Sequence, residues 1–409
     1  MNLSMTRRKE RAGAKGPRPG RKPPRGIDTW LVHGAEAQDL NAGSVVPPIY
    51  QTTTFHYPGQ YSEAKPRGKV HLYTRLENPT TTQVARVVAG LEGAEAARVY
   101  ASGMGALSAA IFSSLRQGDE VVALDELYGN TLTLLGEDLP RFGIRVHWVP
   151  GGDSSRVEEF VTPRTRLLVL ESPTNPTLEV HDLRTWAEAA HKVGALFLVD
   201  NTFATPVNQS PISWGADLVM HAATKYLAGH SDVMAGALAG SRRRLEGVRH
   251  LSETLGATLD PLGAFLLARG LKTLGLRMRR HNENGRAVSE DLRDHPQVLR
   301  VHYPGSRSAV QEAICRRQMK GRGGMVSLVV RGGLGGAHRF MRSLRLVHRA
   351  SSLGGVESLA SLPVETSHRQ LSPEARRARG IDDGMVRISL GIEDPADLIA
   401  DLRHALASV

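Results

Sequence analysis

Short apolar runs alternate with helical-looking stretches through the middle of this 409-residue chain. The runs of strand length are apolar at consecutive positions, so both faces of each strand are expected to be buried. We expect strands over residues 97–101, 120–124, 145–149, 167–170, 196–199, 218–221 and 236–240. Helices are expected between them, over 103–115, 130–142 and 183–193. This alternation predicts a doubly wound α/β domain on a mostly parallel sheet.

The pattern changes after Pro261. Residues 262–292 are expected to form one long helix with little interruption. A mixed pattern follows, with predicted strands and helices over 325–330, 336–344, 385–390 and 395–408. These elements predict a smaller C-terminal α+β domain.

The chain carries 52 Lys and Arg against 41 Asp and Glu, a formal charge of +11. Residues 1–26 hold nine of the basic residues and one acidic residue, so this leader carries +8 and the remainder only +3. Its Gly, Pro and like charges predict disorder. A basic leader leaves nucleic-acid binding open as a rival function, but the nearly neutral body makes it the weaker hypothesis.

A hydrophobic content of 41% is enough for a sizeable core. No apolar run approaches the ~18 to 20 residues needed to cross a bilayer. The leader lacks the apolar segment of a secretory signal, and Cys315 has no second cysteine to pair with. We therefore expect a soluble cytoplasmic protein. The histidines show no spacing typical of a metal site.

Polar residues follow several predicted strands, where ligands of open α/β sheets bind. Small residues after the first strand open a helix and could bind a phosphate there. An aromatic ring, an amide, a carboxylate and an amine follow later strands. These residues are Ser102, Gly103, Met104, Tyr128, Asn175, Asp200, Thr224 and Lys225. Together they fit pyridoxal 5'-phosphate (PLP), which needs an amine, an anion for its ring nitrogen, an aromatic face and phosphate donors.

The motifs occur in an order that resembles one enzyme family. They are Tyr73-Thr74-Arg75, Asn78-Pro79-Thr80, Ser102-Gly103-Met104, Tyr128-Gly129, Glu171-Ser172-Pro173-Thr174-Asn175-Pro176, Val199-Asp200-Asn201-Thr202, Ala223-Thr224-Lys225-Tyr226, Ser352-Leu353-Gly354-Gly355 and Val386-Arg387-Ile388-Ser389. From about Thr29 to Ala407 the chain resembles the Cys/Met-metabolism PLP enzymes, which include cystathionine γ-synthase, cystathionine γ-lyase, methionine γ-lyase and the O-acylhomoserine sulfhydrylases. The resemblance implies a fold-type I, aspartate aminotransferase-like structure. It also implies a homo-oligomer, at least a dimer and in this family a tetramer.

The resemblance also implies roles for the matched residues. Lys225 would bind PLP as a Schiff base and then move protons on the substrate. Asp200 would pair with the ring nitrogen, and Asn175 would hydrogen-bond the ring hydroxyl oxygen. Tyr128 would stack on the ring and take part in proton transfer near the leaving group. Arg387 would bind the substrate α-carboxylate, with Ser352 nearby.

The phosphate would be held by Ser102, Gly103, Met104 and Thr224, and from the neighbouring subunit by Tyr73 and Arg75. The chain would then divide into four parts: the leader 1–26, an arm 27–75 that reaches the neighbouring active site, a cofactor-binding domain 76–260 and a C-terminal part 261–409.

Four positions depart from common family patterns. Ala222 replaces a frequent serine that binds phosphate, and Ser351 stands where the cystathionine enzymes commonly have glutamate. Asn130 replaces the cysteine of typical methionine γ-lyases, and Thr133 stands where cystathionine enzymes often have arginine. The expected reaction is γ-elimination or γ-replacement on a homoserine- or homocysteine-derived amino acid, of cystathionine γ-lyase or γ-synthase type. Methionine γ-lyase and O-acylhomoserine sulfhydrylase activities are the alternatives.

Overall fold

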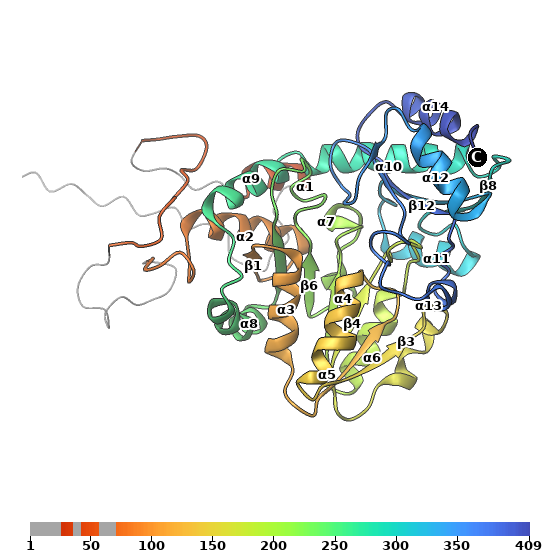
Figure 1. Cartoon of the computed structure of the whole chain (residues 1–409). Coiled ribbons are helices and arrows are strands. Elements are labelled where there is room, and N and C mark those ends of the chain that lie inside the picture. Colours follow the sequence, from red (N-terminus) through yellow and green to blue (C-terminus); the bar gives the residue numbers. More distant parts are fainter. Residues whose placement is uncertain (1–25, 36–41, 57–70) are drawn as a thin grey trace, which may run out of the picture.

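The structure is a computed structural model that describes residues 26–35, 42–56 and 71–409. Residues 1–25, most of the leader for which disorder is predicted, lie outside the described residues. The described part contains two β-sheets surrounded by helices, and the elements nearest the C-terminus gather at one end of the molecule, drawn in blue in Figure 1.

Seven strands form the larger sheet. They are β1 (Ala96–Tyr100), β2 (Glu120–Leu124), β3 (Arg145–Val149), β4 (Thr165–Glu171), β5 (Leu196–Asp200), β6 (Leu218–His221) and β7 (Gly236–Gly240). Their order across the sheet is β1-β7-β6-β5-β4-β2-β3, and the neighbours from β6 to β3 are parallel. Strand β7 runs antiparallel to both β1 and β6. The predicted α/β fold with a mostly parallel sheet is confirmed.

Helices cover both faces of this sheet (Figure 1). They are α1 (Ile27–His33), α2 (Pro79–Glu92), α3 (Gly103–Ser114), α4 (Gly129–Thr133), α5 (Leu139–Arg141), α6 (Leu183–Lys192), α7 (Thr205–Asn208), α8 (Arg242–Leu255) and α9 (Pro261–Leu271). Leu238 of β7 belongs to a core with α3 and α6, whereas Ala237 and Ala239 belong to a core with α2 and α9. Because successive strand side chains point to opposite faces, these cores lie on opposite sides of the sheet.

The smaller sheet lies in the C-terminal part. Its strands are β8 (Val298–His302), β9 (Met325–Val330), β10 (His348–Arg349), β11 (Leu359–Ser361) and β12 (Met385–Ser389), in the order β10-β11-β12-β9-β8. The helices of this part are α10 (Leu274–Asp291), α11 (Ala309–Gln318), α12 (Gly333–Ser343), α13 (Pro373–Ala378) and α14 (Pro395–Leu406). Across the described ranges, no helix is long and apolar enough to cross a membrane.

Several helices begin at an Asn or Asp followed by proline. Asn78 accepts a hydrogen bond from Thr80 N at 2.9 Å at the start of α2. Asp260 and Asp394 cap α9 and α14 in the same way. A carboxylate or amide oxygen satisfies a free N–H of the first turn, and proline in the first position lacks only an N–H that has no helical partner. These dipeptides fix where the helices start.

The single helix predicted over 262–292 is wrong, because the chain forms two helices, α9 and α10, separated at Lys272 and Thr273. The Gly270 carbonyl at the end of α9 accepts hydrogen bonds from Thr273 Oγ1 (3.2 Å) and from the buried Arg277 guanidinium (2.8 Å). Two side chains thus supply the hydrogen bonds that the Gly270 carbonyl lacks where α9 ends. The helical pattern of apolar residues continues across this break, so it does not reveal it. The predicted helix over 130–142 is continuous but contains a π-helical turn between α4 and α5.

Candidate active site

Side chains from both sheets meet beyond the carboxyl ends of the parallel strands. Lys225 lies in the turn after β6, and its Nζ donates a hydrogen bond to Ser352 Oγ at 2.7 Å. Arg387, on β12, donates through Nη1 to Asn175 Oδ1 (2.9 Å) and through Nη2 to the Ser352 carbonyl (3.0 Å). The structure therefore brings four predicted site residues, from four separate segments, into one hydrogen-bonded cluster.

The surroundings of Lys225 make its amine easier to deprotonate than a lysine in water. Burial lowers the pKa of Lys225 to about 8, and the positive charge of Arg387 acts in the same direction. Its hydrogen-bond partner Ser352 has a φ of 90°, which is strained for a residue other than glycine. A neutral amine is nucleophilic and can accept a proton, so Lys225 is prepared for both kinds of chemistry.

Arg387 is a buried cation in the centre of the smaller sheet, between β11 and β9. Its pKa is lowered to about 10 by burial, which the nearby Tyr226 and Glu171 partly offset. Within the described ranges no carboxylate lies within ion-pair distance of it. A buried charge normally has a partner of opposite sign. Arg387 is therefore able to bind an anionic group of a ligand.

Two carboxylates lie side by side at the ends of β4 and β5, where Glu171 and Asp200 are register partners. Burial raises the pKa of Glu171 well above its usual range, and the Asp200 charge raises it further. Burial also raises the pKa of Asp200, but Thr202 lowers it by donating its hydroxyl and its N–H to Asp200 Oδ1, at 2.5 and 2.9 Å. Burial therefore disfavours the charged form of both carboxyl groups, and the hydrogen bonds from Thr202 partly offset this at Asp200.

The turn that opens α3 has the features of a phosphate site. A Cβ on Gly103 would lie 2.8 Å from the Ala222 Cβ, so this position requires glycine. Ser102 caps the helix by accepting a hydrogen bond from Gly105 N at 3.0 Å, and its hydroxyl hydrogen can still be donated. The first N–H groups of the helix, at Gly103 and Met104, have no acceptor within it. Such groups together bind anions.

The predicted phosphate ligand Thr224 already has a partner. Its hydroxyl accepts a hydrogen bond from Ala235 N at 2.8 Å and donates one to Ala235 O at 3.1 Å. A hydroxyl has one hydrogen, so Thr224 could donate to a phosphate only by releasing the Ala235 carbonyl.

Tyr128 lies at the edge of the cluster. Its backbone N–H donates to Glu171 Oε2 at 2.8 Å, and its ring is 39% exposed at the start of α4. The other two predicted residues lie elsewhere in this single chain. The Arg75 guanidinium lies 5.5 Å from the centre of the Tyr73 ring and donates to the Glu253 carbonyl of α8 at 2.6 Å. Tyr73 and Arg75 therefore form an exposed pair whose contacts do not involve Lys225.

Residues 28–407 match the family of Cys/Met metabolism PLP-dependent enzymes. The chain belongs to this family. It is 44% identical over 381 residues to an L-methionine gamma-lyase of Pseudomonas putida, covering 92% of this chain and 96% of the relative. It is 40% identical over 384 residues to a cystathionine gamma-lyase of Dictyostelium discoideum, covering 93% and 97%.

The crystal structure of metB from Corynebacterium glutamicum matches the fold with a TM-score of 0.88 at 35% identity, covering 94% of this chain and 98% of that one. The chain therefore has the fold-type I architecture, and PLP is its cofactor. The residues present fit PLP: a buried amine with a lowered pKa, a buried carboxyl group oriented by Thr202, and a glycine-lined helix start with free N–H groups.

A buried polar network near Asp200 was not anticipated from the sequence. His221, the last residue of β6, shares a hydrogen bond of 2.6 Å with Glu92 Oε1, and Asn201 Nδ2 donates to the same oxygen at 3.0 Å. His221 and Glu92 are both fully buried, and the charge of His221 lowers the pKa of Asp200. The sequence offered one sign of this network, because Glu92 and His221 each end an apolar run. The network ties the ends of β5 and β6 to the end of α2, next to Asp200.

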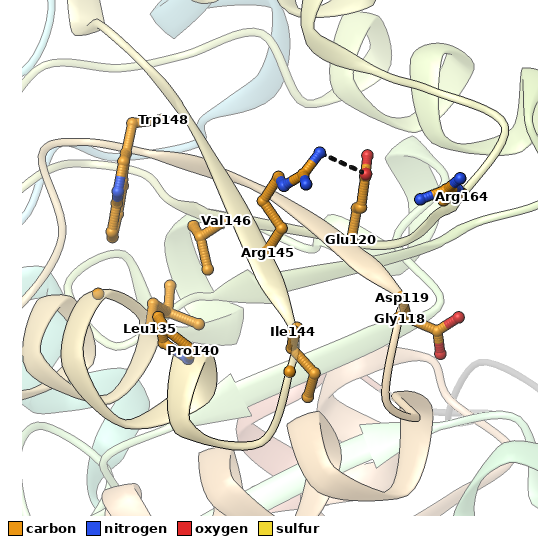
Figure 2. A pocket seen from close by; sticks show the side chains of 12 residues that line it. Gly118, Asp119, Glu120, Leu135, Pro140, Ile144, Arg145, Val146, Trp148 and Arg164 are labelled. Atoms are coloured by element: carbon orange, nitrogen blue, oxygen red, sulfur yellow. Dashed lines mark hydrogen bonds and ion pairs between the residues drawn. The ribbon is translucent and has the colours of Figure 1, made fainter.

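Figure 2 shows a hollow in another part of the molecule, at the amino ends of β2 and β3. Arg145 and Glu120 form an ion pair of 3.4 Å there, and Glu120 also accepts a hydrogen bond from Thr162 at 2.7 Å. Glu120 and Arg145 are the first residues of β2 and β3. The hollow therefore lies at the amino ends of the parallel strands, whereas Lys225 lies beyond their carboxyl ends. None of the predicted site residues lines this hollow, and we assign the active site to the carboxyl ends.

Proposed function

We propose that this enzyme catalyses γ-elimination on a sulfur-containing amino acid, methionine in preference to cystathionine, and releases a thiol, a 2-oxo acid and ammonia. The observation that carries the proposal is the Lys225–Ser352–Arg387 cluster, in which an amine with a lowered pKa lies beside a buried cation. The similarity to γ-lyases supports elimination over replacement.

Three parts of the chain would hold and tune the cofactor. PLP, when bound, supplies a protonated ring that withdraws electrons from an attached amino acid. Lys225 would hold PLP through its amine and, once released, move protons at the substrate Cα and Cβ. Asp200 would pair with the ring nitrogen and keep it protonated. Ser102, Gly103 and Met104 would bind the phosphate.

The remaining residues would position the substrate or contact the cofactor ring. Arg387 would bind its α-carboxylate through the guanidinium. Asn175 accepts a hydrogen bond from Arg387 through Oδ1, so its amide nitrogen would be the group that donates to the ring hydroxyl oxygen. Ser352 would hold the Lys225 amine in place. The exposed Tyr128 ring would cover the cofactor and exchange protons near the leaving group.

The preference for methionine follows from the positions around the distal end of the substrate. The distal ammonium of cystathionine needs an anionic partner, and the glutamate common in cystathionine enzymes is replaced by the exposed Ser351. Thr133 likewise offers no cation where those enzymes often have arginine. An uncharged thioether would not need either partner.

Product analysis tests this function. The purified enzyme would be incubated with methionine, cystathionine or an O-acylhomoserine, each with and without cysteine or sulfide. We expect thiol, 2-oxo acid and ammonia from methionine, with kcat/KM at least about tenfold above that for cystathionine, a difference of about 1.4 kcal/mol, because Ser351 gives the distal ammonium no anionic partner. A higher rate of thioether formation from O-acylhomoserine and thiol would show γ-replacement and overturn the proposal.

Thr202 positions Asp200, and replacing it tests the assigned role of that carboxylate. Its hydroxyl donates to Asp200 Oδ1 and accepts a hydrogen bond from Ala222 N at 2.9 Å. Thr202→Val should weaken PLP binding by roughly 5- to 150-fold, the effect of losing a buried hydrogen bond worth about 1–3 kcal/mol. Equilibrium dialysis of PLP measures this, and Thr202→Ser should restore binding. Unchanged PLP affinity in Thr202→Val would contradict the role.

We also propose the assembly and location of the enzyme. The exposed Tyr73 and Arg75 would reach the phosphate of a neighbouring subunit, so the active unit is at least a dimer and the family implies a tetramer. The arm 27–75, the cofactor domain 76–260 and the C-terminal part 261–409 would be its functional divisions. The free thiol of Cys315 is buried, in keeping with a cytoplasmic protein.

A further inference from the structure

Three buried side chains outside the active site converge on one point. Glu126, Glu179 and His181 are 7%, 4% and 4% exposed. A carboxylate oxygen from each glutamate and a ring nitrogen of the histidine all lie within 4.8 Å of one another. Ligand atoms around one divalent cation are separated by a similar distance, since each lies ~2.0 to 2.6 Å from the ion.

The imidazole is the unpartnered member of this group. His181 Nε2 is buried, and no described residue forms a hydrogen bond with it. An imidazole nitrogen is the commonest metal ligand among protein side chains, and this one belongs to the cluster. A buried polar atom without a partner is costly to the fold unless a ligand completes it. None of the steps proposed for the reaction uses this ring.

Both carboxylates are already oriented by neighbouring side chains. Thr177 Oγ1 donates to Glu126 Oε2 at 2.9 Å, and Gln311 Nε2 donates to Glu179 Oε2 at 3.0 Å. Metal ligands are usually held in this way by a second layer of hydrogen bonds. Arg307 forms an ion pair with the other oxygen of Glu179, and its side chain is 58% exposed. It can therefore turn into solvent and leave that oxygen to a metal.

We propose that Glu126, Glu179 and His181 form a binding site for a divalent transition-metal ion. Zn²⁺ is the best match, because it accepts imidazole together with carboxylate ligands, whereas Mg²⁺ prefers oxygen alone. Glu126 lies two residues before Tyr128, and Glu179 lies four after Asn175. A bound ion would join these two segments behind the active site. The site is separate from the cofactor contacts and does not depend on the proposed reaction.

Metal uptake by the holoenzyme tests this site. Holoenzyme treated with a chelator would be dialysed against Zn²⁺, and bound metal measured by atomic emission and by calorimetric titration. We expect one Zn²⁺ per chain and a higher Tm, and no comparable uptake of Mg²⁺. Glu179→Gln, which keeps the size of the side chain, and His181→Ala should each weaken Zn²⁺ binding by at least about tenfold.

Two further variants distinguish specific Zn²⁺ binding at these three residues from nonspecific binding elsewhere on the protein. His191→Ala removes a histidine that pairs with Asp217 on the surface, and it should leave Zn²⁺ binding unchanged. Arg307→Ala should strengthen binding, because it frees Glu179 from its competing cation. The visible absorbance of bound PLP reports whether each variant is folded. No uptake of Zn²⁺, equal affinity in wild type, Glu179→Gln and His181→Ala, or no gain in Arg307→Ala would overturn the proposal.

Discussion

Replacing Lys225 with alanine is expected to lower the turnover of methionine by roughly 10²- to 10⁴-fold, the usual contribution of a positioned proton-transfer group. The lysine is prepared for this role, because burial lowers its pKa to about 8 and Ser352 holds its amine. Without it, no amine remains in the cluster to hold PLP or to accept the substrate proton. The measurement is kcat at saturating methionine with added PLP, together with the protein-bound PLP that survives gel filtration.

Lys272 provides the matched control. It lies at the end of α9, outside the hydrogen-bonded cluster, and Lys272→Ala removes the same side chain. We expect its kcat and PLP content to remain within about twofold of wild type, as for most substitutions away from special sites. If Lys225→Ala keeps more than about a tenth of the wild-type kcat, its assignment as the proton-transfer group fails.

The hydrophobic pattern predicted the larger sheet well because buried parallel strands leave a strong local signal. Most of its strands are apolar runs separated by helices, and ligand groups follow several of them at the carboxyl end. Asp200 and Lys225 could be predicted as neighbours for this reason. Strand β7 lies between β1 and β6 and runs antiparallel to both. The local sequence does not predict this direction, since the alanines and glycines of β7 can pack in a parallel or an antiparallel strand.

Contacts between distant segments could not be derived from the local pattern. Arg387 contacts Asn175 across 212 positions of sequence, and Lys225 contacts Ser352 across 127. Motif resemblance placed these residues in one site, but the bonds themselves depend on how the smaller sheet packs against the larger one. The break between α9 and α10 likewise depends on the Arg277 side chain, which satisfies a carbonyl at the end of α9.

The proposed metal site at Glu126, Glu179 and His181 could not be predicted from the local sequence either. Metal sites are recognised in sequence by close, regular spacing of ligands on a helix or loop. Here one glutamate precedes the other two residues by more than fifty positions, on the segment after a different strand. Parallel pairing of β2 with β4 brings the two segments together. The sequence therefore predicted no metal site, and only the fold shows the three side chains as neighbours.

Replacing Arg387 with alanine should lower kcat/KM for methionine by roughly 30- to 5000-fold, since truncating one partner of a buried charge pair costs about 2–5 kcal/mol. The guanidinium is buried, and it is fixed by Asn175 and the Ser352 carbonyl rather than by a carboxylate of the described chain. Most of the loss should appear as a higher KM, because the substrate α-carboxylate keeps its charge before and after the reaction. Steady-state kinetics gives kcat and KM separately. The absorbance of bound PLP should stay unchanged in this variant.

Arg387→Lys separates charge from shape in the same site. Lysine keeps the positive charge but lacks the planar pair of donors, so its kcat/KM should fall between those of wild type and Arg387→Ala. Arg300→Ala, at an exposed position of β8 in the same sheet, is the matched control and should behave as wild type. If Arg387→Ala instead loses PLP while its KM for methionine is unaltered, the residue holds the cofactor, and the substrate carboxylate must bind elsewhere.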